Sequence, residues 1–585
     1  MKSARKNNGA MMYIVYESKS KPYTKYLFKY RRKTITFKRG TQNMNTETNP
    51  FVSNCDLCLI GGGYAAVNAL NSATYHLQKG SRVIVIAKEH GWGGNWINQY
   101  NYVRLHQPYQ VFTAGKREWD LLKPDTYLAD KREILRHLED IVYKCVEEKE
   151  LDLLVFFNYL QYDDMEVLNT ADNTGKKQVK LKARHLINEK HNNTENVPQF
   201  LEIHASRVIK GTGFNILPNK PLNSILTPLS SKDNNNIQSI SPSDVLTPEW
   251  NVKMRFKTNG ANVIPAPIYV IGSGKTAMDV IYHLSKKLKG MKDRICCISG
   301  RGTWFVRRDQ FNFTSETPFM QKHSYSYNTP LDWIRETFTM YDGTNGLETL
   351  KELGKKGFLH TPIPGAASFA LGISSTEEIN HVKKVLQPSN EKIIRAHLLG
   401  LVDNVQTKRT QLKLQTIETR EIFYKDLEPG SIIVNCTSHI PNNLKHEPIL
   451  SHEGMVCSPQ YICGFSGPSA NWGTHLFYLN KLEPFWRTIP RLSANSTKKD
   501  QTGLNLFAMV VLGTGYVTNQ IPKEIKDKFD SPALGDLPLH RMLVSGARLG
   551  WKMNTFMKNL FTKMITTRYT DANVDNFFVP VYARL

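Results

Sequence analysis

The stretch Leu59-Ile60-Gly61-Gly62-Gly63-Tyr64-Ala65-Ala66 decides the fold of this chain. It follows a short apolar run and precedes a segment in which apolar residues recur at helical spacing. The motif is G-x-G-x-x-A. Gly61 permits a tight turn, Gly63 lets the backbone approach a pyrophosphate, and the small Ala66 lets the helix pack on the strand. The motif therefore predicts a strand–turn–helix unit whose helix N-terminus faces a dinucleotide.

A second stretch of the same kind, Val270-Ile271-Gly272-Ser273-Gly274-Lys275-Thr276-Ala277, lies far along the chain. Gly272, Gly274 and Ala277 take the same three roles. An apolar-periodic helix and then a second strand follow each turn, at 82–86 and at 294–298, so a β-α-β unit is predicted twice. One such match is a weak signal. Two matches in the same context favour a protein that holds two dinucleotides and passes electrons between them.

Length and charge bound the function. The chain has 585 residues and a formal net charge of +24, which is compatible with nucleic acid, an anionic membrane or polyanionic cofactors. The basic residues are spread along the whole chain, with a cluster only at 31–33, and no nucleic-acid motif accompanies them. We therefore predict a basic, solvated surface with some phosphate binding and no nucleic-acid partner.

The cellular compartment is predicted from what the sequence contains. No apolar run approaches the ~20 residues that span a bilayer, and the N-terminus lacks the apolar core of a signal peptide. The eight cysteines have no regular spacing, which favours a reducing compartment. We expect a cytoplasmic protein without a transmembrane segment. Peripheral membrane contact, a mitochondrial location and the oligomeric state stay open, and the apolar stripe at 549–560 is expected to be core.

The Cys55-x-x-Cys58 motif invites a comparison with disulfide reductases. We expect both cysteines to lie in the strand that enters the first glycine turn. Residues three apart in a strand point to opposite faces, so the two sulfur atoms are predicted not to pair.

The predicted organisation has five parts. A basic, weakly ordered extension at 1–49 precedes a first nucleotide domain at 50–215, a linker at 216–259, a second nucleotide domain at 260–435, and a region at 436–585 that ends in helices. Two segments, at 207–215 and 432–439, are strands that run into small residues. Such segments suit places where the chain crosses between domains close to a cofactor.

Together these motifs resemble the flavin-containing monooxygenase-like branch of the two-dinucleotide flavoproteins. The first turn would take FAD, and Gly93-Gly94-Asn95-Trp96 fits the G-G-x-W that follows in that family. The Gly-Thr-Gly segment at 211–213 comes next, and the second turn would take NADPH. The resemblance implies an α/β fold with two Rossmann-like dinucleotide-binding domains, the NADPH domain inserted in the FAD domain, and a helical C-terminal region.

The resemblance also implies a reaction. NADPH would reduce FAD, and the reduced flavin would react with O₂ to insert one oxygen atom into a small nucleophilic substrate with a nitrogen or sulfur atom. Three departures keep two alternatives open, a reductase or oxidase without oxygen insertion and a degenerate flavoprotein that only binds. Ala87 stands near the place of the acid that holds the FAD ribose, Cys436-Thr437-Ser438 replaces Ala-Thr-Gly, and no F-x-G-x-x-x-H motif lies between the turns.

The candidate catalytic residues are Arg104, His106 and Gln107, which follow Trp96 where related folds approach the flavin ring. Arg104 would offset negative charge on the reduced flavin, and His106 and Gln107 would hydrogen-bond the ring or the bound oxygen. The alternative is a loop whose arginine and histidine only satisfy backbone carbonyls.

Arg301 is the candidate for NADPH specificity. It follows Ser299-Gly300 after the second nucleotide strand, and a small residue followed by arginine suits a 2′-phosphate. We expect Arg307 or Arg308 to assist and Lys275 to add charge near the pyrophosphate. The alternative is a set of surface arginines.

Overall fold

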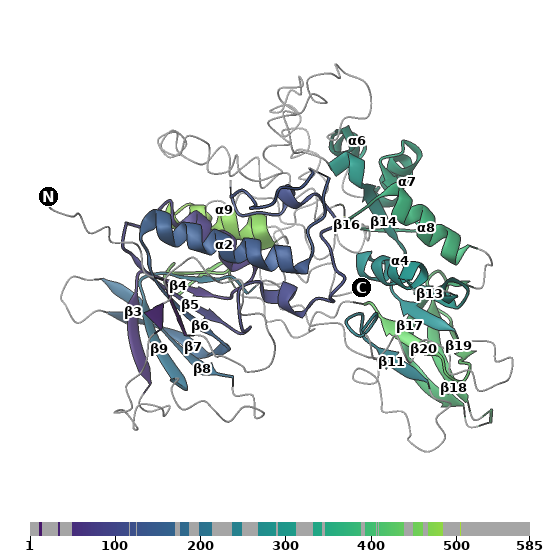
Figure 1. Cartoon of the computed structure of the whole chain (residues 1–585), viewed down its shortest axis with the longest axis horizontal. Helices are drawn as coiled ribbons and strands as arrows, with labels where there is room; N and C mark the ends of the chain where they lie inside the picture. Colours follow the sequence, from purple (N-terminus) through teal and green to yellow (C-terminus); the bar gives the residue numbers. More distant parts are fainter. Residues whose placement is uncertain are drawn as a thin grey trace.

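The computed structural model describes most of the chain between residues 50 and 483, arranged as two lobes (Figure 1). The described residues are 11–14, 33–34, 50–115, 117–124, 126–169, 176–186, 198–212, 237–247, 267–287, 290–311, 332–341, 345–387, 392–404, 406–407, 409–437, 448–459, 466–483 and 504. The predicted apolar stripe at 549–560 and most of the predicted C-terminal helices lie outside them.

The first glycine turn belongs to an eight-stranded sheet with the order β2-β1-β6-β5-β4-β10-β22-β21. Its centre consists of parallel strands that are buried on both faces, which is why they read as continuous apolar runs. The strands are β1 (Met11–Ile14), β2 (Lys33–Thr34), β4 (Leu57–Ile60), β5 (Arg82–Ala87), β6 (Asp152–Phe157), β10 (Val208–Lys210), β21 (Leu450–Ser451) and β22 (Val456–Cys457). Strands β1 and β2 lie within the predicted N-terminal extension, and β1 pairs in parallel with β6.

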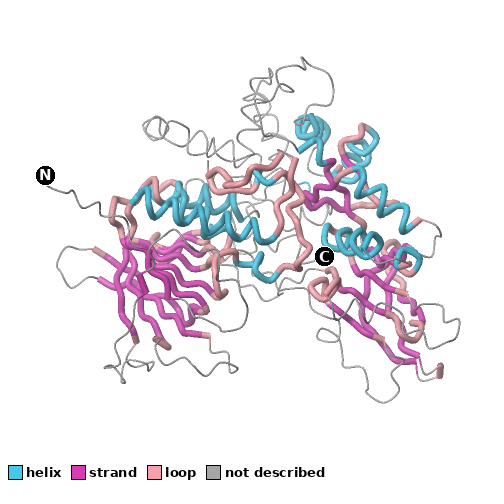
Figure 2. The backbone as a smooth tube through the Cα atoms, in the orientation of Figure 1, coloured by secondary structure: helices cyan, strands magenta, loops and turns pink. Residues whose placement is uncertain are grey.

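Helices and a second sheet cover the two faces of this sheet. Helix α1 (Tyr64–Ala73) packs against α2 (Lys131–Lys149) and α9 (Ser466–Tyr478), and Figure 2 shows the helices gathered over one side of the strands. On the other face lies a four-stranded sheet of β3 (Phe51–Cys55), β7 (Tyr159–Asn169), β8 (Lys177–His185) and β9 (Phe200–Ala205). Each face therefore has its own apolar layer.

The two cysteines of the C-x-x-C motif lie on different strands, so the prediction that they share one strand and point to opposite faces is wrong. Asp56 interrupts the extended segment. Cys55 therefore ends β3 in the four-stranded sheet, and Cys58 belongs to β4 in the main sheet. Both are free thiols buried in the same apolar layer. A hydrogen bond with the Cys55 thiol, together with burial, raises the pKa of Cys58 well above its usual value.

The second glycine turn belongs to a seven-stranded sheet with the order β11-β20-β12-β13-β17-β18-β19. Strand β11, from the predicted linker, pairs in parallel with β20. The strands are β11 (Gln238–Ile240), β12 (Ile268–Ile271), β13 (Ile295–Ser299), β17 (Ile393–Asn404), β18 (Arg409–Thr416), β19 (Ile422–Asp426) and β20 (Ile432–Asn435). Helices α4 (Lys275–Lys287) and α8 (Thr376–Leu386) share a core with this sheet.

A smaller sheet, β15-β14-β16, completes the second lobe beside α6 (Asp332–Met340) and α7 (Gly346–Lys355). Its strands are β14 (Thr303–Arg307), β15 (Leu359–His360) and β16 (Ser368–Ser374). Within the described part of the chain, no helix is both long enough and apolar enough to cross a membrane.

Each segment predicted to cross between domains lies against a glycine turn. After β10 the chain leaves the first sheet, and it returns at β22, which pairs in parallel with β10. Gly211 follows β10 and touches the first turn: a Cβ on Gly61, whose φ is +120°, would lie 2.5 Å from the Gly211 carbonyl oxygen. At the second turn, the Cys436 N–H donates to the Ile271 carbonyl at 3.0 Å.

We predict that Gly211→Ala destabilises the first lobe. A Cβ on Gly211 would lie 2.8 Å from the Ala66 Cα atom, and backbone cannot move away as a flexible side chain can. Overpacking of this kind costs about 1–3 kcal/mol, measured as the loss in the free energy of unfolding in urea. Gly91→Ala is the control, because a Cβ there meets no atom within 4 Å. Equal stability of the two variants would contradict the close approach.

Candidate functional site

The first turn offers an open helix N-terminus. Helix α1 begins directly after Gly63, no side chain caps it, and its first turn contains no acidic residue. The free N–H groups of such a terminus bind anions. The G-G-x-W segment lies on this turn, because the Gly93 N–H donates to the Gly62 carbonyl at 2.8 Å and a Cβ on Gly94 would lie 2.7 Å from the Gly63 Cα atom.

Aromatic rings support the turn from the side. The Phe112 ring stacks on Tyr64, with centroids 4.1 Å apart, and meets the edge of Trp96 at 5.5 Å. The Tyr64 hydroxyl donates to the Thr113 carbonyl at 2.8 Å. Trp96 is thus part of the packing that holds the loop against α1.

Ala87, which stands near the place of an expected acid, packs under the turn. It ends β5, is 1 % exposed, and its Cβ would lie 3.0 Å from a Cβ on Gly62. Glu89, two residues later, is half-buried, and its carbonyl accepts a hydrogen bond from the Asn158 N–H at 3.1 Å. Position 87 therefore supplies packing and no carboxylate.

The second turn has more space around it. Among the described residues, a Cβ on Gly274 would meet no atom within 4 Å, and the first turn of α4 contains no acidic residue. Ala277 is fully buried in the core of this lobe. At the end of the next strand, the Ser299 hydroxyl is buried, and no partner for it is found among the described residues. Arg301 follows, and its carbonyl accepts from the Ala367 N–H at 2.7 Å.

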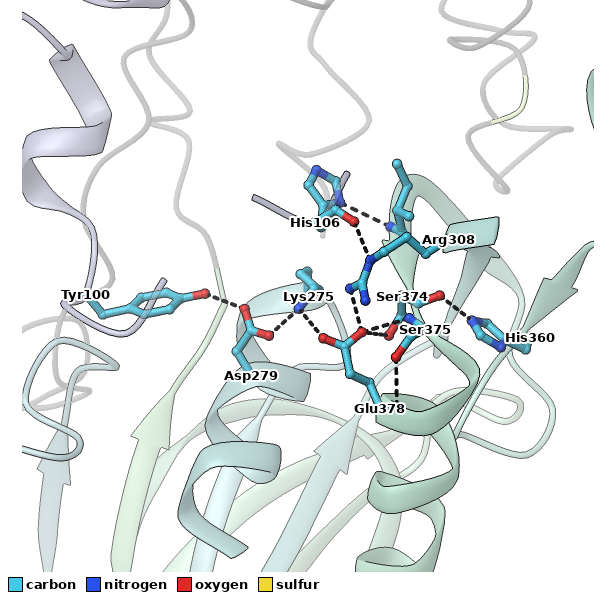
Figure 3. Close-up of polar contacts among 10 residues, drawn as sticks. Tyr100, His106, Lys275, Asp279, Arg308, His360, Ser374, Ser375 and Glu378 are labelled. Carbon is cyan, nitrogen blue, oxygen red and sulfur yellow. Dashed lines mark hydrogen bonds and ion pairs between the residues drawn. The ribbon is translucent and has the colours of Figure 1, made fainter. Parts of the chain in front are cut away.

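Lys275, the first residue of α4, lies in a network of partly buried charges (Figure 3). Its ammonium pairs with Asp279 one turn later and lies 3.8 Å from a Glu378 oxygen. Asp279 also accepts a hydrogen bond from the Tyr100 hydroxyl at 2.9 Å. Glu378 accepts from the Arg308 guanidinium at 2.6 Å, from the Ser374 hydroxyl at 2.9 Å and from the Ser375 N–H at 2.7 Å.

Glu378 is ionised in this network. Burial opposes the charged carboxylate, but the nearby Lys275 and Arg308 cations and the donors at Ser375 and Ser374 outweigh it and lower the pKa of Glu378 to about 2. Glu378 is also the acid of a capping box at the N-terminus of α8, whose N-cap is Ser375. One side chain thus caps a helix and binds two cations.

The predicted catalytic segment contacts the second lobe at this network. The Ile373 N–H donates to His106 Nδ1 at 3.1 Å, and Arg308 Nε donates to the His106 carbonyl at 3.1 Å. Burial, followed by the Lys275 and Arg308 cations, lowers the pKa of His106 to about 3. The ring is therefore neutral near pH 7, with its proton on Nε2.

The other two candidates lie in different surroundings. Arg104 is exposed, donates to the Leu128 carbonyl at 2.8 Å and lies over the Tyr127 ring. The Gln107 side-chain oxygen is buried and has no partner among the described residues. The structure thus places His106 beside Lys275 and leaves Arg104 in carbonyl contact, the alternative that the sequence left open for that residue.

Some members of the network escaped the sequence analysis although signals for them exist. Asp279 stands four residues after Lys275, the spacing of a helical ion pair, and Glu378 completes an S-x-x-E capping box. Tyr100 carries no comparable signal, because its partner lies on a distant element. Arg307 pairs with Asp309, and Arg308 pairs with Glu378. Both guanidinium groups, which the sequence suggested as helpers of Arg301, are thus engaged by carboxylates.

We predict that Glu378→Gln lowers the free energy of unfolding by about 3 kcal/mol at pH 7, since it removes the negative charge that faces the partly buried cations Lys275 and Arg308. The folded pKa near 2 lies below the usual 4.5, so the carboxylate stabilises above pH 4.5 and loses its effect as the pH falls toward 2. The difference from wild type should shrink over that range in urea titrations. Glu377→Gln, at the exposed neighbouring position, is the control, with an effect under about 0.5 kcal/mol. Similar losses for both variants at pH 7 would contradict the assignment.

Of the comparisons with known proteins, only the one with solved structures gives matches. No protein-family model matches the sequence, and no curated protein matches it. The chain is similar in structure to the FAD-bound cadaverine monooxygenase DfoA of Erwinia amylovora (12 % identity, 74 % of this chain and 95 % of that one, TM-score 0.42). It is also similar to the ornithine N-hydroxylase KtzI of Kutzneria sp. 744 with reduced FAD, NADP⁺ and L-ornithine (11 %, 74 % and 99 %, 0.37). A third similar structure is the closed form of cyclohexanone monooxygenase (12 %, 86 % and 98 %, 0.40).

Proposed function

We propose that this protein is an NADPH-dependent FAD oxidoreductase, and specifically a monooxygenase that inserts one oxygen atom into a small substrate with a nucleophilic nitrogen or sulfur atom. One observation carries the proposal. In each of the two large sheets, a strand of the parallel part ends in a G-x-G-x-x-A turn at a helix N-terminus without an acid. The segment after the first turn contacts the helix of the second turn through the hydrogen bond from Tyr100 to Asp279.

FAD fits the first turn. Gly61, Gly63 and Ala66 form the turn, Gly93 and Gly94 lie against it, and the uncapped N-terminus of α1 supplies N–H groups for the pyrophosphate. Because Ala87 supplies no carboxylate for the ribose, we expect the protein to hold FAD less tightly than a relative with an acid there would.

NADPH fits the second turn. The open space beside Gly274 leaves room for a pyrophosphate, and Arg301 supplies the charge for a 2′-phosphate. Lys275 lies next to this turn, although Asp279 and Glu378 now hold its ammonium. In this proposal the NADPH domain is an insertion, since the chain leaves the first sheet after β10 and returns at β22.

When bound, FAD supplies hydride acceptance and the reaction with O₂. The protein's part is to orient and to exclude water. Gln107 is the best placed of the three candidates for this work, because its buried side-chain oxygen lacks a partner among the described residues and can accept a hydrogen bond from a bound group. His106 holds the loop through Nδ1 and keeps its Nε2–H as a donor.

The reductase or oxidase alternative is favoured by Arg104. The Leu128 carbonyl holds its exposed guanidinium, so it is not directed into a buried site where it would stabilise negative charge during oxygen chemistry. In that alternative NADPH still reduces FAD, and the reduced flavin passes its two electrons either to another acceptor, as in a reductase, or to O₂, as in an oxidase, which then leaves as hydrogen peroxide.

Two valine variants test the cofactor assignment. Gly63→Val should purify without flavin, because a branched side chain would fill the place of the pyrophosphate. Gly274→Val should keep its flavin spectrum, yet its flavin should no longer bleach with NADPH under anaerobic conditions. Each variant serves as the control for the other. Loss of flavin in both, or in neither, would contradict the assignment of the two turns.

A coupling measurement tests the oxygen chemistry. With a panel of primary amines and thiols, the wild type should give oxygenated product in proportion to the NADPH consumed, and Gln107→Ala should divert at least half of the electrons to hydrogen peroxide. Gln161→Ala, on exposed β7 of the side sheet, should behave as wild type. Stoichiometric peroxide from the wild type with every substrate would favour the oxidase.

A further inference from the structure

The carboxyl end of β13 brings a histidine next to Arg301. Strand β13 pairs in parallel with β17, and Ser299 lies opposite Arg395. Two residues further along, Arg301 lies just beyond the end of β13, whereas His397 is still within β17 and senses the Arg301 charge. The imidazole lies on the face of Gly300, because a Cβ there would be 2.9 Å from Cε1 and 3.1 Å from Nδ1 of His397.

The surroundings of His397 are positive and contain unsatisfied polar groups. Burial, and after it the Arg301 charge, lowers the pKa of His397 below its usual value. On the same strand, Arg395 lies 3.7 Å from Glu418, the nearby acid, and its Nε atom is buried without a partner among the described residues. Opposite His397 on β18 stands the neutral Gln415. The buried Ser299 hydroxyl also lacks a partner in the described part of the chain.

We propose that His397 is a second recognition residue for the 2′-phosphate of NADPH, and that it takes up a proton when the phosphate binds between it and Arg301. The proposal rests on the proposed binding of NADPH at the second turn. Gly300 is part of the same arrangement, because a side chain at that position would push the imidazole away.

The direction of the proton exchange follows from the charges. In the free protein, burial and then the Arg301 cation hold the pKa of His397 below its usual value, so the neutral ring predominates near pH 7. A phosphate dianion next to the ring reverses this balance and favours the imidazolium, so binding takes up a proton and strengthens as the pH falls through the pKa of the ring in the complex. The phosphate itself, with a second pKa near ~6, gives up a proton on binding to cations. The two contributions have opposite signs and can be separated.

Titration calorimetry of the full-length protein with 2′,5′-ADP and with 5′-AMP tests the proposal. The probes differ only in the 2′-phosphate, and two buffers of different ionisation enthalpy at pH 7 report the number of protons exchanged. His397→Ala should weaken 2′,5′-ADP about tenfold, as expected for a lost charge-assisted hydrogen bond, and 5′-AMP less than twofold. His397→Gln should keep part of the affinity but show no proton uptake.

Two further variants complete the design. Gly300→Ala, which displaces the ring, should reproduce the selective loss for 2′,5′-ADP. His204→Gln, at a histidine of the four-stranded side sheet that pairs with Glu202, should leave both affinities and the proton uptake unchanged. The loss of proton uptake in His397→Gln is a readout that a merely structural role would not move.

Each remaining outcome decides against the proposal. Equal weakening of both probes in His397→Ala and His397→Gln would mean that the residue only supports the fold of the site. Wild-type proton uptake in His397→Gln would assign the proton to another group. If wild type binds 2′,5′-ADP no better than 5′-AMP, the proposed NADPH specificity fails together with this inference.

Discussion

The structure depends on how closely three pieces of backbone approach one another at the first glycine turn. No side chain fits between Gly61 and the Gly211 carbonyl, or between Gly211 and Ala66. Through these contacts the turn, the following helix and the segment that leaves β10 form one unit. This unit sets where α1 begins, and therefore where its free N–H groups point. The returning strand β22 then adds to the same sheet beside β10.

The sequence was sufficient to predict the two β-α-β units with their glycine turns, because their signals are local. A buried parallel strand, a glycine turn and an apolar-periodic helix are each encoded within about ten residues, and both units are present as β4-α1-β5 and β12-α4-β13. The β11 strand was beyond such analysis, since only three residues form it and its place depends on β20. The change of sheet at Asp56 also could not be predicted, because a single residue between two strands redirects the chain from one sheet to the other.

In the candidate site, too, some features could be predicted from the local sequence and others could not. The glycine positions follow from backbone geometry, which the motif encodes directly. The surroundings of Arg104, His106 and Gln107 depend on contacts with residues such as Leu128 and Ile373, which no local pattern reveals. Chemical type alone suggested three similar polar groups. In the structure, Arg104 is an exposed cation that donates to a carbonyl, and His106 is a neutral ring that fixes the loop. Gln107 is a buried amide whose side-chain oxygen has no partner among the described residues.

The pairing pattern around Lys275 has a mechanical consequence. Asp279 keeps the Tyr100 hydroxyl, and Glu378 keeps Arg308 and two donors at the start of α8, whether or not the lysine is present. The ammonium can therefore swing toward an anion at the adjacent turn without leaving either carboxylate bare. The contacts between the lobes would persist during such a move, and only the net charge of the network would change. Around Asp279, next to Tyr100, the net charge would go from neutral to negative. Lys275 can therefore leave its ion pairs while the other contacts between the two lobes stay in place.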